Sequence, residues 1–372
     1  YENNYVGGTR VAVADLDGDG IDEIITAPGR NRAPDVKIFT QDGQDAGFPS
    51  FLGNDAAFMG GIHLAVGDVN GDTYPDIITV PSYGAANVRI FLNQYPAQRA
   101  FVLDYSFQAF PVASVGGAVV AAGDMGRLLA DGSFVYAPDG KAEIVVATGV
   151  GTKATVSVFD VSTGTRKQVQ NFFPFTAVFS NFTGGVALDV AEINGDGIPD
   201  IIASMGVNGT SRIEVWDLNT GNAAPALLGA IPNVFTGPSN NAPVNVAAMD
   251  TSGDGIADAI FAVQGPIGTV GEVHRFDITG TSPLAYQQAD PLTGFSGPWF
   301  IATSKSAPSG PVPQPGPLAA SAITVWTNPD NPYDVNNEGF VSPLDVLVTI
   351  NHINANPGET SLPARQSSPP WW

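Results

Sequence analysis

The chain has 372 residues and a formal net charge of −21, from 36 acidic and 15 basic side chains. This charge repels phosphate backbones, so it argues against nucleic acid as a partner. The absence of cysteine excludes disulfides, thiolate metal sites and cysteine nucleophiles. No apolar run reaches the length of a transmembrane helix, so we expect no membrane insertion. With 43 glycines, 30 prolines and 44% hydrophobic residues, the composition favours a turn-rich, all-β protein with a core.

One phrase recurs five times, at a spacing of roughly 55 residues, which suits one four-stranded propeller blade. Each copy has an apolar segment, an acidic loop and a second apolar segment, which predicts two strands joined by a tight turn. A third strand follows, as at Val36–Phe39, and an aromatic-Gly-Gly phrase such as Phe58-Met59-Gly60-Gly61 ends the blade. The copies are VAVADLDGDGIDEIITAPG (11–29), LAVGDVNGDTYPDIITVPS (64–82), VALDVAEINGDGIPDIIASMG (186–206), VAAMDTSGDGIADAIFAVQG (246–265) and a stretched copy that begins at 119 and resumes at 139–149.

After the fifth copy, Phe295-Ser296-Gly297-Pro298 restarts the phrase and predicts one further strand at Trp299–Thr303, without an acidic loop. We therefore expect residues 1–304 to form a β-propeller of five recognisable four-stranded blades and a partial sixth. Residues 305–322 are rich in Pro, Ser, Gly and Ala, which is typical of an extended linker. Because both ends of the chain lie inside repeat-like phrases, we expect a fragment of a longer protein.

The acidic loops predict metal binding. With the first acid of each loop as position 1, oxygen-bearing side chains recur at positions 3, 5 and 9, and glycine recurs at position 6. A tight coil brings positions 1, 3 and 5 together, and glycine accepts the turn that the coil requires. The predicted ligands are Asp15, Asp17, Asp19 and Glu23 in loop one, Asp68, Asn70, Asp72 and Asp76 in loop two, Asp124, Asp139 and Glu143 in loop three, Glu192, Asn194, Asp196 and Asp200 in loop four, and Asp250, Ser252, Asp254 and Asp258 in loop five.

Oxygen ligands without His or Cys select a hard cation, and a flexible cage of this size suits Ca²⁺ better than Mg²⁺. The alternative is that Asp-Gly and Asn-Gly only mark β-turns, but five copies between the same two strands favour metal. We expect each ion to be structural and to tie two strands of one blade together. Thr73 stands at position 6 of loop two, where we expect strain, and loop three carries an insertion between its first two acids.

These phrases resemble FG-GAP (VCBS-type) repeats, which are found in integrin α-chain propellers and in many bacterial surface and secreted proteins. The resemblance covers residues 1–304. It implies a β-propeller with about one calcium ion per acidic loop, a secreted or cell-surface location, and adhesion to or binding of an extracellular protein or glycan.

Residues 334–345, DVNNEGFVSPLD, have the spacing of an EF-hand-like calcium loop followed by a helix. The segment at 323–372 resembles one half of a type I dockerin of the kind found in planctomycete-like secreted proteins. Two features depart from the dockerin pattern: Glu338 replaces the usual Asp, and no second loop–helix unit follows. Two interpretations are therefore open, a segment that binds a cohesin-like partner and a lone calcium-stabilised helix. The predicted ligands are the side chains of Asp334, Asn336, Glu338, Ser342 and Asp345 and the backbone carbonyl of Phe340.

No Ser/His/Asp setting, phosphate loop, dinucleotide fingerprint or zinc motif is visible. We expect His63, His274 and His352 on strand or helix surfaces and expect no catalytic activity. The predicted function is a calcium-binding extracellular module for adhesion, scaffolding or protein/glycan binding.

Two alternatives are open. One is a propeller domain of a carbohydrate-active enzyme, either polysaccharide lyase-like or accessory to a missing catalytic domain. A tyrosine, histidine and basic cluster on one propeller face would favour it. The other is a structural surface-layer or filament subunit that self-associates through the unpaired edge of the incomplete sixth blade.

Overall fold

The computed structural model describes residues 1–303 apart from short gaps at 2–4, 6, 112–115, 221–223, 236–240, 265–269, 282–283, 289–291 and 297–300. These residues form strands and turns without an α-helix, which confirms the all-β prediction. Among them there is no helix long and apolar enough to cross a membrane. The predicted linker at 305–322 and the dockerin-like segment at 323–372 lie outside the described residues.

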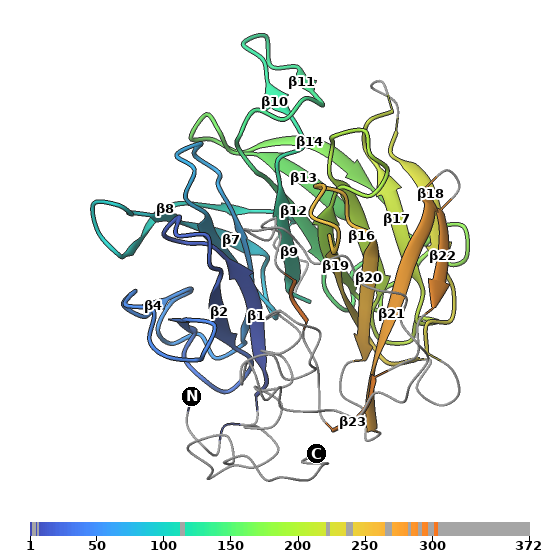
Figure 1. The fold of residues 1–372 in the computed structure, drawn as a ribbon, viewed down its shortest axis with the longest axis horizontal. Coiled ribbons are helices and arrows are strands. Elements are labelled where there is room, and N and C mark those ends of the chain that lie inside the picture. Colours follow the sequence, from blue (N-terminus) through green and yellow to red (C-terminus); the bar gives the residue numbers. More distant parts are fainter. Residues whose placement is uncertain are drawn as a thin grey trace.

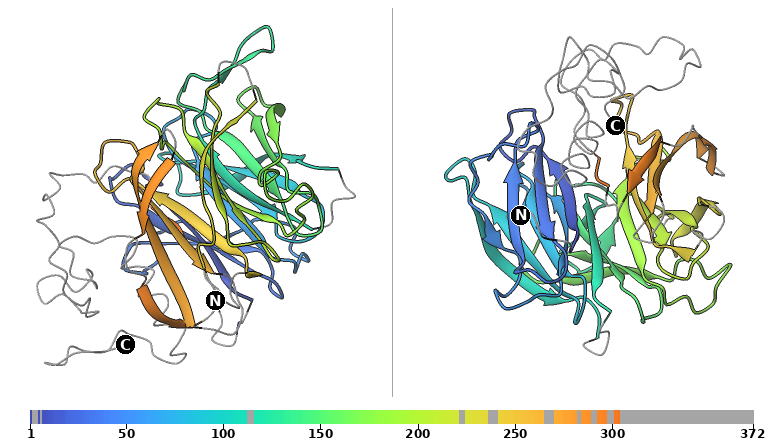
Figure 2. Two further views of the ribbon diagram at one scale, coloured as in Figure 1. Left: turned by 90° about the vertical axis from the view of Figure 1, so that its right-hand side faces the viewer. Right: turned by 90° about the horizontal axis from the view of Figure 1, so that it is seen from below.

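Five antiparallel sheets follow one another in chain order around an arc, and the fold is a β-propeller with five blades (Figure 1; Figure 2, right). The first strands of consecutive blades, β1, β5, β9, β15 and β19, contact one another. The strands are β1 (Thr9–Ala14), β2 (Glu23–Pro28), β3 (Asp35–Phe39) and β4 (Phe51–Leu52) in blade one; β5 (Ile62–Gly67), β6 (Asp76–Pro81), β7 (Asn87–Asn93) and β8 (Phe101–Gln108) in blade two; β9 (Ala118–Gly123), β12 (Glu143–Thr148), β13 (Val156–Asp160) and β14 (Lys167–Phe172) in blade three; β15 (Val186–Ala191), β16 (Asp200–Met205), β17 (Ile213–Asp217) and β18 (Ala226–Ile231) in blade four; and β19 (Val244–Met249), β20 (Ala259–Gln264), β21 (Val270–Thr281), β22 (Leu284–Gln288) and β23 (Leu292–Ser296) in blade five.

The second strand of every blade is buried along its whole length. A propeller sheet packs against a neighbouring blade on each face, so its central strands read as continuous apolar runs rather than as an alternation of apolar and polar residues. The apolar segments Ile24–Ala27 and Ile77–Val80, which the sequence predicts as second strands, show this pattern and lie inside β2 and β6.

A hydrophobic cluster fills each interface between consecutive blades. Phe48 of blade one packs against Phe101 of blade two, with ring centroids 5.6 Å apart. Phe107 packs against Phe159 at the next interface, at 5.1 Å. Burial of such rings removes large apolar areas from water and is the main stabilising term of the interfaces.

The turns divide the propeller into two faces. The face that carries the loops between the first and second strands is called the acidic-loop face. There the insertion of loop three forms a hairpin, β10 (Arg127–Leu128) and β11 (Phe134–Val135), which projects at the top of Figure 1. The opposite face, called the glycine face, carries the second-to-third-strand loops and the Gly-Gly connections between blades.

Glycine is required at the glycine face by close approach of the backbone. Gly29 N–H donates to Gly8 O at 2.8 Å, and Ser82 N–H donates to Gly61 O at 2.9 Å in the next blade. A Cβ built on Gly29 would lie 1.9 Å from Gly7 O. The Gly-Gly phrase therefore closes each of blades one to four onto its own second strand.

Blade five departs from the prediction in two ways. The chain from 292 to 296, for which the sequence predicts no strand, forms β23 and pairs with the start of the long strand β21. Ile301–Thr303, the described part of the strand expected at Trp299–Thr303, is not a strand. It is held by side chains instead, because the Thr303 hydroxyl donates to Ala248 O and Ile301 packs against the Phe261 cluster beside β19.

Candidate metal centres

Each acidic loop is anchored by its last acid. The position 9 carboxylate stands where the second strand begins and accepts the N–H of the residue after position 1, which pins the end of the loop to its beginning. The donor–acceptor pairs are Leu16 to Glu23 (2.8 Å), Val69 to Asp76 (3.0 Å), Met125 to Glu143 (2.8 Å), Ile193 to Asp200 (3.0 Å) and Thr251 to Asp258 (3.2 Å).

The position 1 carboxylate organises the coil. Asp15 Oδ1 accepts the N–H groups of Gly18 at 2.7 Å and Asp19 at 3.1 Å, and its Oδ2 accepts that of Gly20 at 2.8 Å. The position 6 residue has positive φ in every loop, with values of 86° at Gly20, 77° at Thr73, 86° at Gly140, 83° at Gly197 and 88° at Gly255. Thr73 is β-branched and holds this angle at a cost that glycine avoids.

Loop one gathers three carboxylates. Asp15, Asp17 and Asp19 each bring one carboxylate oxygen to within 4.8 Å of the others. Asp17 is 9% exposed; its Oδ2 pairs with Arg99, and its Oδ1 is buried without a hydrogen-bond partner. A buried carboxylate oxygen without a donor is costly, so an oxygen-binding cation fits this cluster.

Loop one is also clamped by the next blade. Arg99 of blade two reaches both Asp17 and Ala46 O, the latter at 2.8 Å, and Asn93 Nδ2 donates to Leu16 O at 2.8 Å. Sequence reasoning missed both residues because they lie in the neighbouring blade, far from the loop along the chain, and no motif marks them.

Loop four also contains a buried carboxylate oxygen without a hydrogen-bond partner. Glu192 Oε1 accepts the N–H of Gly195 at 2.6 Å, while its Oε2 is buried without a hydrogen-bond partner. Asn194 and Asp196 follow the same coil, since Asn194 Oδ1 accepts the N–H of Asp196 at 2.9 Å. A cation at this position would satisfy the second oxygen of Glu192.

Loops two and five have the same coil, with three acids each where loop one has four. Asp68 accepts the N–H groups of Gly71 and Thr73, both at 2.6 Å. In loop two, Asn70 Nδ2 donates to Asp72 Oδ2 at 3.0 Å. In loop five, the predicted residues are Asp250, Ser252, Asp254 and Asp258, and Ser252 Oγ donates to Asp250 Oδ1 at 3.1 Å.

In loop three, the residues on either side of the insertion come together. Asp124 accepts the N–H groups of Asp139 at 3.0 Å and Gly140 at 2.7 Å, as Asp15 does with Asp19 and Gly20. The predicted residues Asp124, Asp139 and Glu143 are thus brought to one loop. Gly126 stands at position 3 and offers no side-chain oxygen; its N–H donates to Glu143 Oε2 at 3.0 Å. Loop three therefore offers one ligand fewer than the others.

Burial makes the position 9 carboxyls of loops one to four hard to ionise. Burial raises the pKa of Glu23 and of Asp76 to about 7, that of Asp200 to about 8 and that of Glu143 to about 9, and neighbouring acids add to the effect. A divalent cation beside these groups would favour the charged form. The predicted C-terminal ligands from Asp334 to Asp345 lie outside the described residues.

The two histidines that the structure describes, His63 and His274, lie within strands β5 and β21. His274 was expected on a strand surface, and this prediction is wrong. It is 7% exposed, because β21 packs against blade four and the imidazole lies 4.4 Å from the Phe235 ring. His63 lies on β5 towards the glycine face, where burial and the charge of Arg10 hold its pKa well below the usual value. His352 lies outside the described residues.

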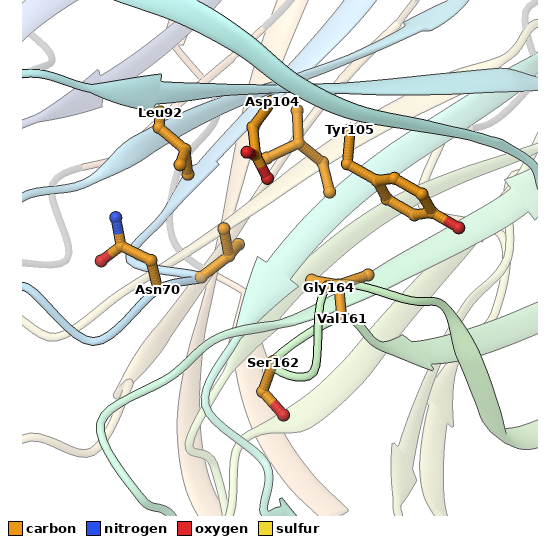
Figure 3. Close-up of a pocket in the computed structure, with 9 residues that line it drawn as sticks. Asn70, Leu92, Asp104, Tyr105, Val161, Ser162 and Gly164 are labelled. Atoms are coloured by element: carbon orange, nitrogen blue, oxygen red, sulfur yellow. The ribbon is translucent and has the colours of Figure 1, made fainter.

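One small cavity borders loop two. Its volume is about 130 Å³, and it lies between blades two and three (Figure 3). Asn70 lines one side, and Asp104, Tyr105 and Ser162 line the others. Ligand pockets in proteins hold roughly 300–1,000 Å³, so this cavity is too small for an oligosaccharide or a cofactor.

Comparison with known proteins agrees with this architecture. Residues 15–79, from the first acidic loop into β6, match the family model of the FG-GAP-like repeat. The chain therefore carries an FG-GAP-like repeat within a five-bladed propeller, a kind of repeat typical of extracellular proteins.

Solved structures resemble the chain at low identity. A protein from Lactobacillus plantarum is 13% identical, with 76% of this chain and 70% of that chain covered and a TM-score of 0.44. An exotype rhamnogalacturonan lyase is 12% identical, with 77% and 66% covered and a TM-score of 0.39. A Bacillus licheniformis rhamnogalacturonan lyase is 14% identical, with 75% and 56% covered and a TM-score of 0.36.

Proposed function

We propose that this chain is a calcium-binding, extracellular β-propeller module that binds a protein or glycan ligand and is not itself catalytic. The observation that carries the calcium proposal is the partnerless, buried Oδ1 of Asp17 inside a cluster of three carboxylates. The same coil recurs in every blade, and oxygen-only ligands suit Ca²⁺. The ion in each loop joins the first and second strands of its blade.

The test is calcium binding measured by isothermal titration on the wild type, on Asp17→Asn and on Asp104→Asn. Asp104 is an exposed acid on β8 and serves as a matched control. We expect Asp17→Asn to lose the tightest calcium-binding event and Asp104→Asn to leave it unchanged. Equal binding by all three proteins would contradict a cation site at loop one.

A second candidate, catalysis on an acidic polysaccharide, is supported by a different observation. At the glycine face, the Tyr5 hydroxyl donates to Gly8 O at 3.1 Å and Arg10 donates to the adjacent Gly7 O at 3.5 Å, and burial together with the charge of Arg10 lowers the pKa of His63. This is the tyrosine, histidine and basic cluster that would favour a lyase-like enzyme, in which one group removes a proton and the cation stabilises the carboxylate. Ultraviolet absorbance of unsaturated uronate, formed from a uronate polymer, would detect such activity.

A further inference from the structure

The loops of consecutive blades touch backbone to backbone at the glycine face. Gly117 N–H donates to Gly84 O at 2.9 Å across one blade interface, and Gly151 N–H donates to Thr183 O at 2.8 Å across the next. A Cβ built on Gly61 would lie 2.9 Å from Arg30 N, and one on Gly117 would lie 2.5 Å from Tyr83 N. A glycine thus lies between the loops at each interface from blade one to blade four.

Equivalent positions of these loops carry exposed side chains. Arg30, Tyr83 and Val150 stand two residues after the second strands of blades one, two and three. Tyr83 and Val150 are both 54% exposed, and Phe173, in the following connection, is 42% exposed. A glycine of the next blade, Gly61, Gly117 or Gly185, lies against the backbone of Arg30, Tyr83 and Val150 respectively.

The two exposed rings are each held beside a cation. Arg30 Cζ lies 5.1 Å from the centroid of the Tyr83 ring, and Lys153 Nζ lies 3.9 Å from that of Phe173. Cation–π contacts fix both partners at modest energetic gain. A planar apolar surface and a positive charge are therefore presented together at two places on this face.

The charge of this face differs from that of the whole protein. Within the described loops and strand starts of the glycine face, the acids Asp35, Asp55 and Glu214 are each ion-paired with arginine or lysine. Arg10, at the start of β1, adds a further positive charge. Arg30 and Lys153 therefore offer positive charge on this face, although the chain as a whole has a net charge of −21.

We propose that the glycine face binds an acidic polysaccharide, with sugar rings stacked on Tyr83 and Phe173 and uronate carboxylates paired with Arg30 and Lys153. The apolar C–H face of a sugar ring packs on an aromatic ring, and guanidinium matches a carboxylate in a bidentate fashion. Nucleic acid fits less well, because its dense phosphates meet the net negative charge of the whole protein. The proposal deepens the binding function proposed above and rests on it.

The test uses the calcium-loaded 372-residue chain and a hyaluronan oligosaccharide, whose carboxylates recur once per disaccharide. The same oligosaccharide after carboxyl reduction is the neutral probe. The variants are Arg30→Ala, Tyr83→Ala and Lys153→Ala, with Arg127→Ala as the matched control because Arg127 is exposed on the hairpin of the acidic-loop face. Melting temperatures of all variants are compared first, and each is expected to match the wild type.

We expect Arg30→Ala to weaken binding about tenfold, the loss of one charge-assisted contact, and Tyr83→Ala and Lys153→Ala to weaken it several-fold. Arg127→Ala should bind as the wild type does, and the reduced probe should bind weakly. Equal binding of both probes, or of single-stranded DNA at the same salt concentration, would overturn the proposal, as would equal losses in Arg127→Ala and Arg30→Ala. A calcium-dependent melting temperature without oligosaccharide binding would overturn this inference alone and leave the calcium proposal standing.

Discussion

At the glycine face, the acid Glu214 is bound by the protein itself: Arg212 Nε donates to it at 2.8 Å, and so does Phe175 N–H. At the acidic-loop face, Asp17 and Glu192 keep a buried carboxylate oxygen without a hydrogen-bond partner. At the glycine face, Arg212 and a backbone N–H neutralise the buried Glu214. At the acidic-loop face, one carboxylate oxygen each of Asp17 and Glu192 lacks such a donor. If the acidic loops bind calcium as proposed, stability at the acidic-loop face should depend on solution cations and stability at the glycine face should not.

The largest effect is expected at Glu214. Replacing it with alanine leaves the buried donors of Phe175 and Arg212 without their acceptor, and loss of one partner of a buried ion pair costs about 3–5 kcal/mol of unfolding free energy. Urea unfolding should show the same loss with calcium and with EDTA. Asp277→Ala, which breaks an exposed pair with Arg275, is the control and should cost at most about 1 kcal/mol. A calcium-dependent loss at Glu214 would contradict the division between the faces.

Unlike the alanine variant of Glu214, Asp200→Asn should lower the unfolding free energy only when calcium is bound. Burial raises the pKa of Asp200 to about 8, so without calcium the neutral amide replaces a carboxyl that is largely protonated at neutral pH. We expect little change in unfolding free energy in EDTA. With calcium at about 100 times its dissociation constant, loss of one bound ion removes about 2.7 kcal/mol. An equal loss in both conditions would show that Asp200 stabilises the fold without a cation.

The dependence of stability on pH should differ between the metal-free and calcium-loaded protein. Glu23 and Asp76 have pKa values raised from 4.5 and 3.8 to about 7 in the folded state. The metal-free folded state therefore binds more protons than the unfolded state over this range, and its stability falls as pH rises from about 4 towards 7. Calcium favours the ionised carboxylates and should flatten or reverse this slope. Identical slopes in EDTA and in calcium would exclude these acids from a cation site.

The smallest effect is expected at Thr73, the non-glycine residue at position 6. Its φ of 77° is strained for a β-branched side chain, and replacement by glycine should stabilise the protein by about 1 kcal/mol. Thr152→Gly, in a loop of the glycine face, is the control; its φ is not positive, so glycine there should destabilise slightly. Thermal unfolding of both variants in calcium measures the difference. A destabilised Thr73→Gly would show that the threonine side chain contributes more than its backbone strain costs.

Much of the fold could be predicted from the repeat. The strand positions and the coil of each acidic loop recur with the same local spacing, so Asp15, Gly20 and Glu23 have equivalents in other blades that can be aligned by eye. Loop three shows how robust the pattern is, because Asp124 and Asp139 meet although a hairpin separates them. Local backbone hydrogen bonds govern these features, and local sequence encodes them.

Contacts between blades could not be predicted. Arg99 reaches Asp17 from the next blade, and Arg30 meets the Tyr83 ring in the same way. Each pair depends on how two sheets pack, which no spacing along the chain reveals. His274 was misplaced for the same reason, since the strand pattern does not show that both faces of a propeller sheet are covered.

Calcium binding by the acidic loops can be tested by a thermal unfolding series in calcium, magnesium and EDTA. A cation that binds only the native state must raise the melting temperature as its concentration rises. We predict a large rise with calcium, a much smaller one with magnesium and the lowest melting temperature in EDTA. The same melting temperature in all three solutions would contradict calcium binding and leave the acidic loops as plain turns.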